Sequence, residues 1–203
     1  MAQNDKNTEQ RILDAAGEVF HSKGFDGARM QEIAQHAGIN KGLLHYYFKT
    51  KDALFDAIFG IALNQIVSRI NIILEQDLSL DEKIDLIVDQ YMDLLLKNPM
   101  LPRFVLNELN KNADKFISRH FNQKVKSSFS KFPISVNEEV SKGAIRFIDA
   151  HQLFTDLISL VMFPFVGKPM LQTVFGTDNN EYKKLLEARK SHIKEFLKAA
   201  MRV

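Results

Sequence analysis

The side chains best suited to chemistry gather in one short segment, within the stretch AQHAGINKGLLHYYFKTKDAL at positions 34–54. Lys41 supplies a cation, His45 an imidazole, and Tyr46 and Tyr47 two phenols. Such groups donate hydrogen bonds to phosphate oxygens and reach the edges of nucleic-acid bases. The segment is only about two helical turns long, which is too short for a helix that is stable alone. It must therefore be supported by neighbouring elements and displayed to a partner.

Helical patterns surround this segment and would position it. Apolar residues between positions 8 and 23 recur at the spacing of one helix face, and Gly24 is typical of a helix end. A second apolar run with the same period ends at Gly38. Asn40 is a good N-cap for the short segment, and Thr50 is the next N-cap. The pattern thus predicts two supporting helices before the short segment and a long helix after it.

The rest of the chain is also predicted to be helical. The long helix is expected to reach about residue 76, and Ser79 and Glu82 form a capping box for the next helix, which ends before Pro99. Further helices are predicted at 102–112, 114–131, 150–163 and 180–201. Residues 132–148 have the weakest pattern and predict at most a partial helix. Because no strand pattern stands out, the fold class is all-α, with eight or nine helices.

The composition is that of a soluble globular protein. Hydrophobic residues make up 45% and charged residues 26% of the 203 residues, as is usual for that class. The lack of cysteine excludes disulfides and thiolate metal sites and fits a cytoplasmic protein. The start of the chain predicts no signal peptide, and the longest apolar stretch, from Leu153, is too short to span a membrane. Net charge is only +2, so bulk charge gives no sign of nucleic-acid binding.

Residues 11–55 resemble the N-terminal domain of the tetracycline-repressor (TetR) family of bacterial transcription regulators. The resemblance lies in F-x-x-x-G-[FY] at the end of the first helix, then I-A-x-x-A-G-[VI], then x-K-G-x-L-x-Y-x-F-x-x-K. It implies a three-helix helix-turn-helix DNA-binding domain at 6–66, with the motif at about 29–48. It also implies a larger ligand-binding and dimerisation domain at 67–203, which matches the family only in being helical.

Two positions depart from the family pattern. Ala28 stands where the family usually has a capping Ser or Thr, so Gly27 or Asp26 is expected to substitute as the cap. Leu43 stands where Thr or Ser is usual, and it could pack on a thymine methyl group. Lys41 and Lys51 are expected to bind phosphates. The predicted DNA-binding residues are Arg29, Gln31, Lys41, Gly42, Leu43, His45, Tyr46, Tyr47 and Lys51.

The body of the chain is rich in phenylalanine, with ten of the 16 Phe between positions 104 and 175. Most of these are expected to form core. The resemblance implies a cavity for a small apolar or amphipathic effector, and such a cavity needs apolar walls with a few polar groups. The predicted ligand-binding residues are Tyr91, Met92, Leu95, Phe104, Asn107, Phe121, Phe154, Asp156, Ile158 and Met162.

The helix from Ala150 and the final helix are expected to form the interface of a homodimer, as the resemblance suggests. Apolar stripes on both helices would pair in a four-helix bundle. The residues of these stripes are Leu153, Leu157, Leu160, Val161, Leu186, Ile193, Phe196 and Leu197. The basic residues of the final helix are interpreted as its solvated face.

The function predicted from these features is a DNA-binding transcriptional regulator, a repressor released from a palindromic, inverted-repeat operator by a small ligand. The alternatives are a helical-bundle metal enzyme and a scaffold protein that binds no DNA. A carboxylate-bridged metal site needs Glu-x-x-His on each of two helices, and only Glu18-x-x-His21 fits. The sequence therefore predicts no enzyme, metal or cofactor.

Overall fold

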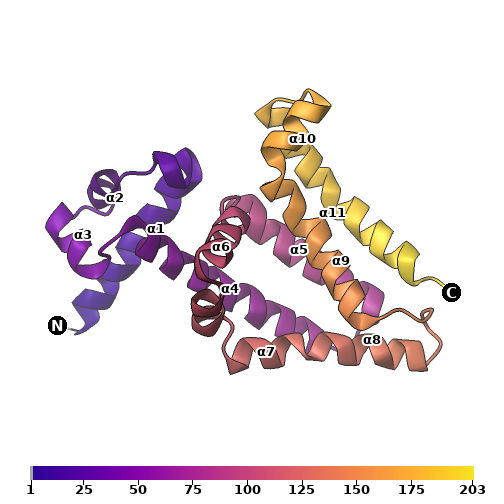
Figure 1. Ribbon diagram of the computed structural model, residues 1–203. Helices are drawn as coiled ribbons and strands as arrows, with labels where there is room; N and C mark the ends of the chain where they lie inside the picture. Colours follow the sequence, from indigo (N-terminus) through magenta and orange to yellow (C-terminus); the bar gives the residue numbers. More distant parts are fainter. Residues whose placement is uncertain (1) are drawn as a thin grey trace. The chain divides into compact units, whose positions relative to one another are not determined.

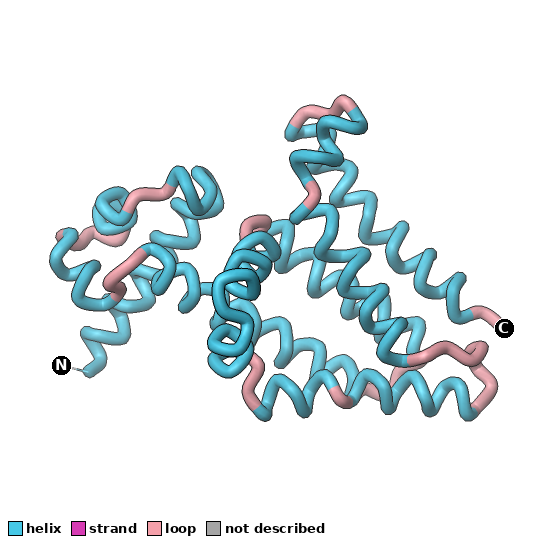
Figure 2. The backbone as a smooth tube through the Cα atoms, in the orientation of Figure 1, coloured by secondary structure: helices cyan, strands magenta, loops and turns pink. Residues whose placement is uncertain are grey.

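The computed structural model describes residues 2–203, and the side chains of all of these except residues 2–6 and 124. Within these residues the protein has eleven helices and no strand (Figures 1 and 2), which confirms the all-α fold class. The helices are α1 Ala2–Gly27, α2 Met30–His36, α3 Lys41–Tyr47, α4 Lys51–Glu75, α5 Leu80–Lys97, α6 Leu101–His120, α7 Gln123–Phe129, α8 Lys131–Ser141, α9 Ala150–Val166, α10 Lys168–Phe175 and α11 Asn179–Met201. The expected number of eight or nine was too low.

The chain divides into two compact units. The first unit comprises Met1–Leu63 together with Asn98–Leu101, and the second comprises Asn64–Lys97 together with Pro102–Val203. Helix α4 is continuous over both, since it begins in the first unit and ends in the second.

The first unit is built from α1, α2, α3 and the start of α4. Its core includes Ile12, Ile33, Leu44 and Leu54, none of which has accessible surface. Aromatic rings are also part of this core. Phe55 contacts both Phe20 and Phe25 edge-to-face, at centroid distances of 4.8 and 5.4 Å. Burial of these side chains supplies the stability that the short helices α2 and α3 lack alone.

The predicted helix ends and caps are confirmed at the start of the chain. The backbone of α1 leaves helical geometry at Gly24, with φ of 71°. The Asn40 side chain accepts a hydrogen bond from the Leu43 N–H at 2.8 Å, and Thr50 Oγ1 accepts from the Ala53 N–H at 3.0 Å. These bonds satisfy backbone donors that a helix start leaves free.

The second unit has α5, α9 and α11 at its centre. These three helices pack on one another, α8 packs on α5 and α9, and α10 packs on α9. The predicted capping box at the start of α5 is confirmed, because the Ser79 N–H donates to Glu82 Oε2 at 2.9 Å and the Glu82 N–H donates to Ser79 Oγ at 3.3 Å.

The middle of the second unit differs from the sequence prediction. A single helix at 114–131 was wrong, because α6 ends at His120 and α7 begins at Gln123. Asn122 causes this restart, since its side chain accepts from the Val125 N–H at 3.1 Å as an N-cap. Residues 132–148 hold most of α8, which ends at Ser141, so helix covers only part of this stretch, as predicted. Helix α10 was not predicted at all.

The predicted dimer stripes on α9 and α11 are mostly core of the single chain, so that assignment was wrong. Because both helices pack on α5, the stripes are used within the chain. Of the eight residues only Leu160 and Phe196 keep appreciable exposure. The six buried ones are Leu153, Leu157, Val161, Leu186, Ile193 and Leu197.

The lysines of α11 also differ from the expectation of a solvated face. Lys190, Lys194 and Lys198 form ion pairs with aspartates of α5. Both sets of residues recur every fourth position, so the pairs stack along the two helices. The Lys194–Asp89 and Lys198–Asp85 pairs measure 2.7 and 2.9 Å between nitrogen and oxygen.

Helix α4 is long and apolar enough to cross a membrane, as judged by length and composition alone. Helices α9 and α10 meet the same criterion only together, and they are bent by 73° at the break between them. A core helix of a soluble protein passes the same test. Because Leu54, Phe59, Ile66 and Ile70 of α4 are buried in the chain, we interpret α4 as such a core helix.

Candidate nucleic-acid interface

Helices α2 and α3 form a helix-turn-helix. They are joined by a tight turn at Gly38, whose φ of 65° lies in the left-handed region that favours glycine. A Cβ atom at this position would lie 2.9 Å from the Arg11 guanidinium, which is the movable end of a long side chain, so the positive φ is the stronger reason for glycine here. Leu44 anchors α3 from behind, because it is fully buried.

The opposite face of α3 is exposed. Lys41, Gly42 and His45 are all accessible, and Leu43 and Tyr46 expose 38% and 78% of their surface. Tyr47 is only partly exposed. It contacts Tyr46 edge-to-face, with ring centroids 5.4 Å apart. An α-helix with its side chains is about 10–12 Å in diameter, so a helix such as α3 fits a major groove that is about 12 Å wide.

The start of α2 corrects one detail of the prediction. The N-cap is Arg29, with no side-chain capping bond, rather than Ala28, Gly27 or Asp26. Ala28 offers no capping bond, because its side chain has no hydrogen-bond acceptor, and its methyl group is part of the core. The side chains of Arg29 and Gln31 are exposed, as a contact with DNA would require.

Lys51 has internal partners that the sequence did not reveal. Its ammonium group donates to the Phe25 and Ala28 carbonyls at 2.6 and 3.1 Å, with the Asp26 carbonyl at 3.4 Å. The same nitrogen lies 4.5 Å from the centroid of the Phe25 ring. An ammonium has three donors, and here three carbonyls surround it. In this arrangement Lys51 holds the connection between α1 and α2, while its predicted phosphate contact stays a prediction.

Arg11 is a second supporting cation, and the sequence reasoning missed it. Its guanidinium donates to the carbonyl of Ala37 and approaches that of Gly38 at 3.4 Å. These carbonyls belong to the turn between α2 and α3, and a cation there also suits the C-terminal end of α2. Lys23 of α1 adds an ion pair with Glu32 of α2. The helix-turn-helix is therefore fixed to α1 at several points.

The ten predicted ligand-binding residues all lie in the second unit. Met92, Leu95 and Phe104 are buried, whereas Asn107 and Asp156 are exposed. The remaining five, namely Tyr91, Phe121, Phe154, Ile158 and Met162, are partly exposed.

Aromatic contacts bring some of these residues together with other rings. Phe154 lies 5.4 Å from Phe129 and 5.6 Å from Phe132, and both contacts are edge-to-face. Phe104 and Phe121 both contact Phe116. Although Tyr91 keeps some accessible surface, desolvation of its phenol raises the pKa of this group above its usual range. The role of the ten residues in ligand binding stays a prediction.

Among the described residues, no group of three or more His, Asp or Glu side chains is placed to hold a metal ion.

The supported short helix with an exposed polar face defines a helix-turn-helix DNA-binding protein. Residues 12–58 match the family described as bacterial regulatory proteins, tetR family, and residues 81–196 match the tetracyclin repressor-like C-terminal domain. The second match alone covers more than half of the chain. The protein therefore belongs to the TetR family of transcription regulators.

Individual relatives agree with this assignment. The fatty acid metabolism regulator protein of Bacillus subtilis is 28% identical over 85 residues, which cover 42% of this chain and 44% of the relative. The aligned region thus spans less than half the length of that relative. The structure of FadR from Bacillus subtilis in complex with stearoyl-CoA is 20% identical with a TM-score of 0.68, covering 93% of this chain and 96% of FadR.

A second solved structure shows the same fold. A TetR/AcrR-family transcriptional regulator from Thermobifida fusca is 17% identical with a TM-score of 0.66, covering 92% of this chain and 96% of that chain.

Proposed function

We propose that this protein is a cytoplasmic, ligand-responsive repressor that binds an inverted-repeat operator as a homodimer. Residues 6–66 would serve as the DNA-binding domain and residues 67–203 as the ligand-binding and dimerisation domain. The observation that carries the proposal is α3, a helix of seven residues with a buried anchor at Leu44 and an exposed polar face. The relatives are regulators, so the metal-enzyme and scaffold alternatives are not favoured.

The exposed residues of α2 and α3 take distinct roles in this proposal. Lys41 binds a phosphate, and its contact is independent of base sequence. Arg29 and Gln31 read base edges, since their side chains can form paired hydrogen bonds with guanine and adenine. Leu43 packs on a thymine methyl group. Gly42, His45, Tyr46 and Tyr47 complete the surface, and Lys51 supports it from α4.

The dimer surface is proposed to lie on the exposed apolar residues of α9, α10 and α11 rather than on the buried stripes. Phe163 of α9 and Phe196 of α11 each expose 51% of their surface. The other exposed apolar residues are Met170, Val174 and Phe175 of α10. Large apolar side chains of this kind are costly in water and mark interfaces when they gather. Replacing Phe196 by Ser should therefore weaken dimers in sedimentation experiments.

The ligand is proposed to be amphipathic with a long apolar part. The second unit is rich in phenylalanine, and the relative FadR was solved with stearoyl-CoA. Long-chain acyl thioesters are thus the first ligand class to test. Helix α4 connects the two units without a break and is the proposed route between ligand and DNA. To reverse a 99:1 equilibrium, the ligand must prefer the non-binding state by about 5.5 kcal/mol.

Selection of bound sequences from random duplex DNA tests the proposal directly. We expect an inverted repeat, because one α3 helix covers only a few base pairs and two copies are needed. Half-site centres should lie about 34–36 Å apart, or a multiple of this spacing. Failure to enrich any sequence, or enrichment of a single unrepeated site, would contradict the proposal.

A further inference from the structure

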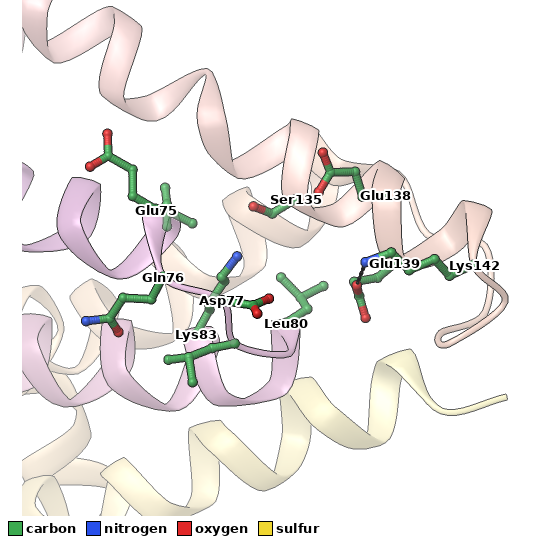
Figure 3. Close-up of a pocket in the computed structure, with 11 residues that line it drawn as sticks. Glu75, Gln76, Asp77, Leu80, Lys83, Ser135, Glu138, Glu139 and Lys142 are labelled. Carbon is green, nitrogen blue, oxygen red and sulfur yellow. Dashed lines mark hydrogen bonds and ion pairs between the residues drawn. The ribbon is translucent and has the colours of Figure 1, made fainter.

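A cleft of about 300 Å³ lies in the second unit, where the end of α4, the start of α5 and α8 come together (Figure 3). None of the predicted DNA-binding or ligand-binding residues lines it. A volume near the lower end of the usual range for ligand pockets suits a small metabolite rather than a long acyl chain. The cleft therefore needs an explanation separate from the effector proposed above.

Two of the carboxylates that line the cleft are already paired. Glu75 binds Lys131, and this hydrogen bond lowers the pKa of the Glu75 carboxyl. Glu139 binds Lys142 at 2.8 Å, and this contact raises the pKa of the ammonium group. Both carboxylates are thus held in their charged state by an internal cation.

Three further charged residues line the cleft without a hydrogen bond or ion pair of their own, and the charge of Lys142 attracts two of them, Asp77 and Glu138. Asp77, Lys83 and Glu138 form no hydrogen bond or ion pair through their side chains with any part of the chain that the structure describes. They carry two negative charges and one positive charge. The unpaired groups thus offer both signs of charge to a ligand.

Ser135 adds a hydroxyl donor at the wall of the cleft. Only 8% of its surface is accessible, and its hydroxyl has no hydrogen-bond partner among the described residues. In Figure 3 this hydroxyl, from α8, and the Lys83 side chain, from α5, point toward the same space. An oxygen of a ligand in the cleft would accept a hydrogen bond from this hydroxyl.

We propose that this cleft binds a small zwitterion of the amino-acid class. The carboxylate of the ligand accepts hydrogen bonds from Lys83 and Ser135, and its ammonium group donates to Asp77 and Glu138. The C-terminal end of α4 also borders the cleft, and the negative end of a helix dipole favours a cation. The lining residues Leu74, Leu78 and Leu80 offer apolar surface to the rest of the ligand.

The arrangement disfavours ligands with a single charge. A simple anion would satisfy Lys83 and Ser135 but would face two unpaired carboxylates. A simple amine would pair with those carboxylates but would leave Lys83 and Ser135 without a partner. Only a molecule with both charges compensates all four groups at once, which is the basis of the expected selectivity.

Calorimetric titration of the full-length protein without DNA tests this proposal independently of the regulator function. The probes are the common L-amino acids, together with propionate and ethylamine as single-charge controls. We expect saturable binding of at least one amino acid, with both controls at least about tenfold weaker. No saturable binding by any amino acid, or equal binding of either control, would overturn the proposal.

Variants of the cleft locate the site. Lys83→Met should weaken amino-acid binding by about tenfold or more, equivalent to about 1.4 kcal/mol, and Ser135→Ala should weaken it severalfold. Lys184→Met, at an exposed lysine of α11 outside the cleft, is the matched control and should leave binding unchanged. Thermal unfolding verifies that each variant folds. If Lys83→Met does not fold, the affinity of Ser135→Ala decides the test. Unchanged affinity in the folded cleft variants would overturn the assignment.

Discussion

Lysine and tyrosine are used differently in the two units. Lys41 and Tyr46 of α3 are exposed to solvent, and Tyr46 exposes 78% of its surface. In the second unit, Lys194 of α11 is bound to Asp89 of α5. Tyr182 has no accessible surface and donates its hydroxyl to the Pro164 carbonyl at 2.7 Å. The environment of a lysine or tyrosine, rather than its residue type, therefore decides whether it is available to a partner or stabilises the fold.

Lys51 is the informative exception. It belongs to the first unit by position, but its ammonium group is surrounded by carbonyls of the α1–α2 connection, as in the second unit. The structure therefore divides the cations of the DNA-binding unit into two groups. Lys41 is available to a partner, and Lys51 and Arg11 support the elements that present it.

The largest expected effect follows from removing Leu44, the buried side chain that anchors α3 beneath its exposed face. Leu44→Ala should lower the free energy of unfolding of the first unit by about 2–5 kcal/mol, because a fully buried leucine leaves a cavity. DNA binding should be lost with it. Leu43→Ala, one residue along the same helix, is the matched control and should cost less than about 1 kcal/mol in stability. Chemical denaturation of both variants measures the difference, and similar losses would contradict the assignment of the two faces.

The second prediction separates Lys51 from Lys41. Lys51→Met should destabilise the first unit by about 1.5–3 kcal/mol, because hydrogen bonds to a charged group are lost. Because carbonyls of the α1–α2 connection already bind the Lys51 ammonium group, we expect the salt dependence of DNA binding to stay unchanged, in contrast to the phosphate contact expected from the sequence. Lys41→Met should have little effect on stability but should reduce the slope of log K against log salt by about one per site. A reduced slope for Lys51→Met would show instead that Lys51 binds a phosphate.

The third prediction concerns what the displayed face reads. Arg29→Ala or Gln31→Ala should relax the preference for the contacted base pair by about 1–3 kcal/mol. Binding to unrelated DNA should change far less for Gln31→Ala, because the residue carries no charge. Competition experiments with single-base variants of the selected operator provide the measurement. Equal losses on all sequences would assign these residues to the phosphate backbone.

The fourth prediction uses the buried tyrosine. Burial raises the pKa of Tyr182, so the folded state holds this proton more tightly than the unfolded state does. The contribution to stability is thus fully present below a pH of about 10 and is lost as the pH rises above it. Tyr182→Phe should cost about 1 kcal/mol at neutral pH through the lost hydrogen bond.

The same substitution should make the alkaline loss of stability less steep. Tyr46→Phe, at an exposed tyrosine, is the control and should leave the pH profile unchanged. Denaturation between neutral and alkaline pH gives the comparison. An identical alkaline slope in wild type and Tyr182→Phe would exclude Tyr182 as its source.

The smallest expected effect is that of one ion pair between α5 and α11. A double-mutant cycle with Asp89→Asn and Lys194→Met should give a coupling energy of about 0.2–1 kcal/mol, because both groups are partly exposed and screened by water. The coupling should decrease with added salt. A coupling of zero at low salt would mean that these lysines belong with the solvated residues after all.

Local signals made much of the fold predictable. Asn40, Thr50 and Ser79 are cap residues whose hydrogen bonds form within three positions of the chain, so sequence spacing suffices to find them. The boundary at Asn122 was missed, because the same residue type is also tolerated inside a surface helix. The N-cap of α2 is Arg29, which forms no side-chain capping bond, so no capping signal in the sequence marks this boundary.

Long-range partners explain the errors at the candidate sites. Periodicity identified apolar stripes on α9 and α11 but could not tell whether α5 of the same chain or a second chain covers them. The carbonyls that surround Lys51 come from residues more than twenty positions earlier. The exposed face of α3 was predictable, because its motif combines an internal anchor and external polar groups within one short segment.

The central claim is that the exposed face of α3 delivers sequence-specific recognition of duplex DNA by a dimer. The direct measurement is the affinity for the selected inverted repeat against the same duplex with one half-site scrambled, at a stated salt concentration. We expect intact repeats to bind at least about a thousandfold more tightly than unrelated DNA, with the half-scrambled duplex between the two. Equal affinity for the intact repeat, the half-scrambled duplex and unrelated DNA would contradict it.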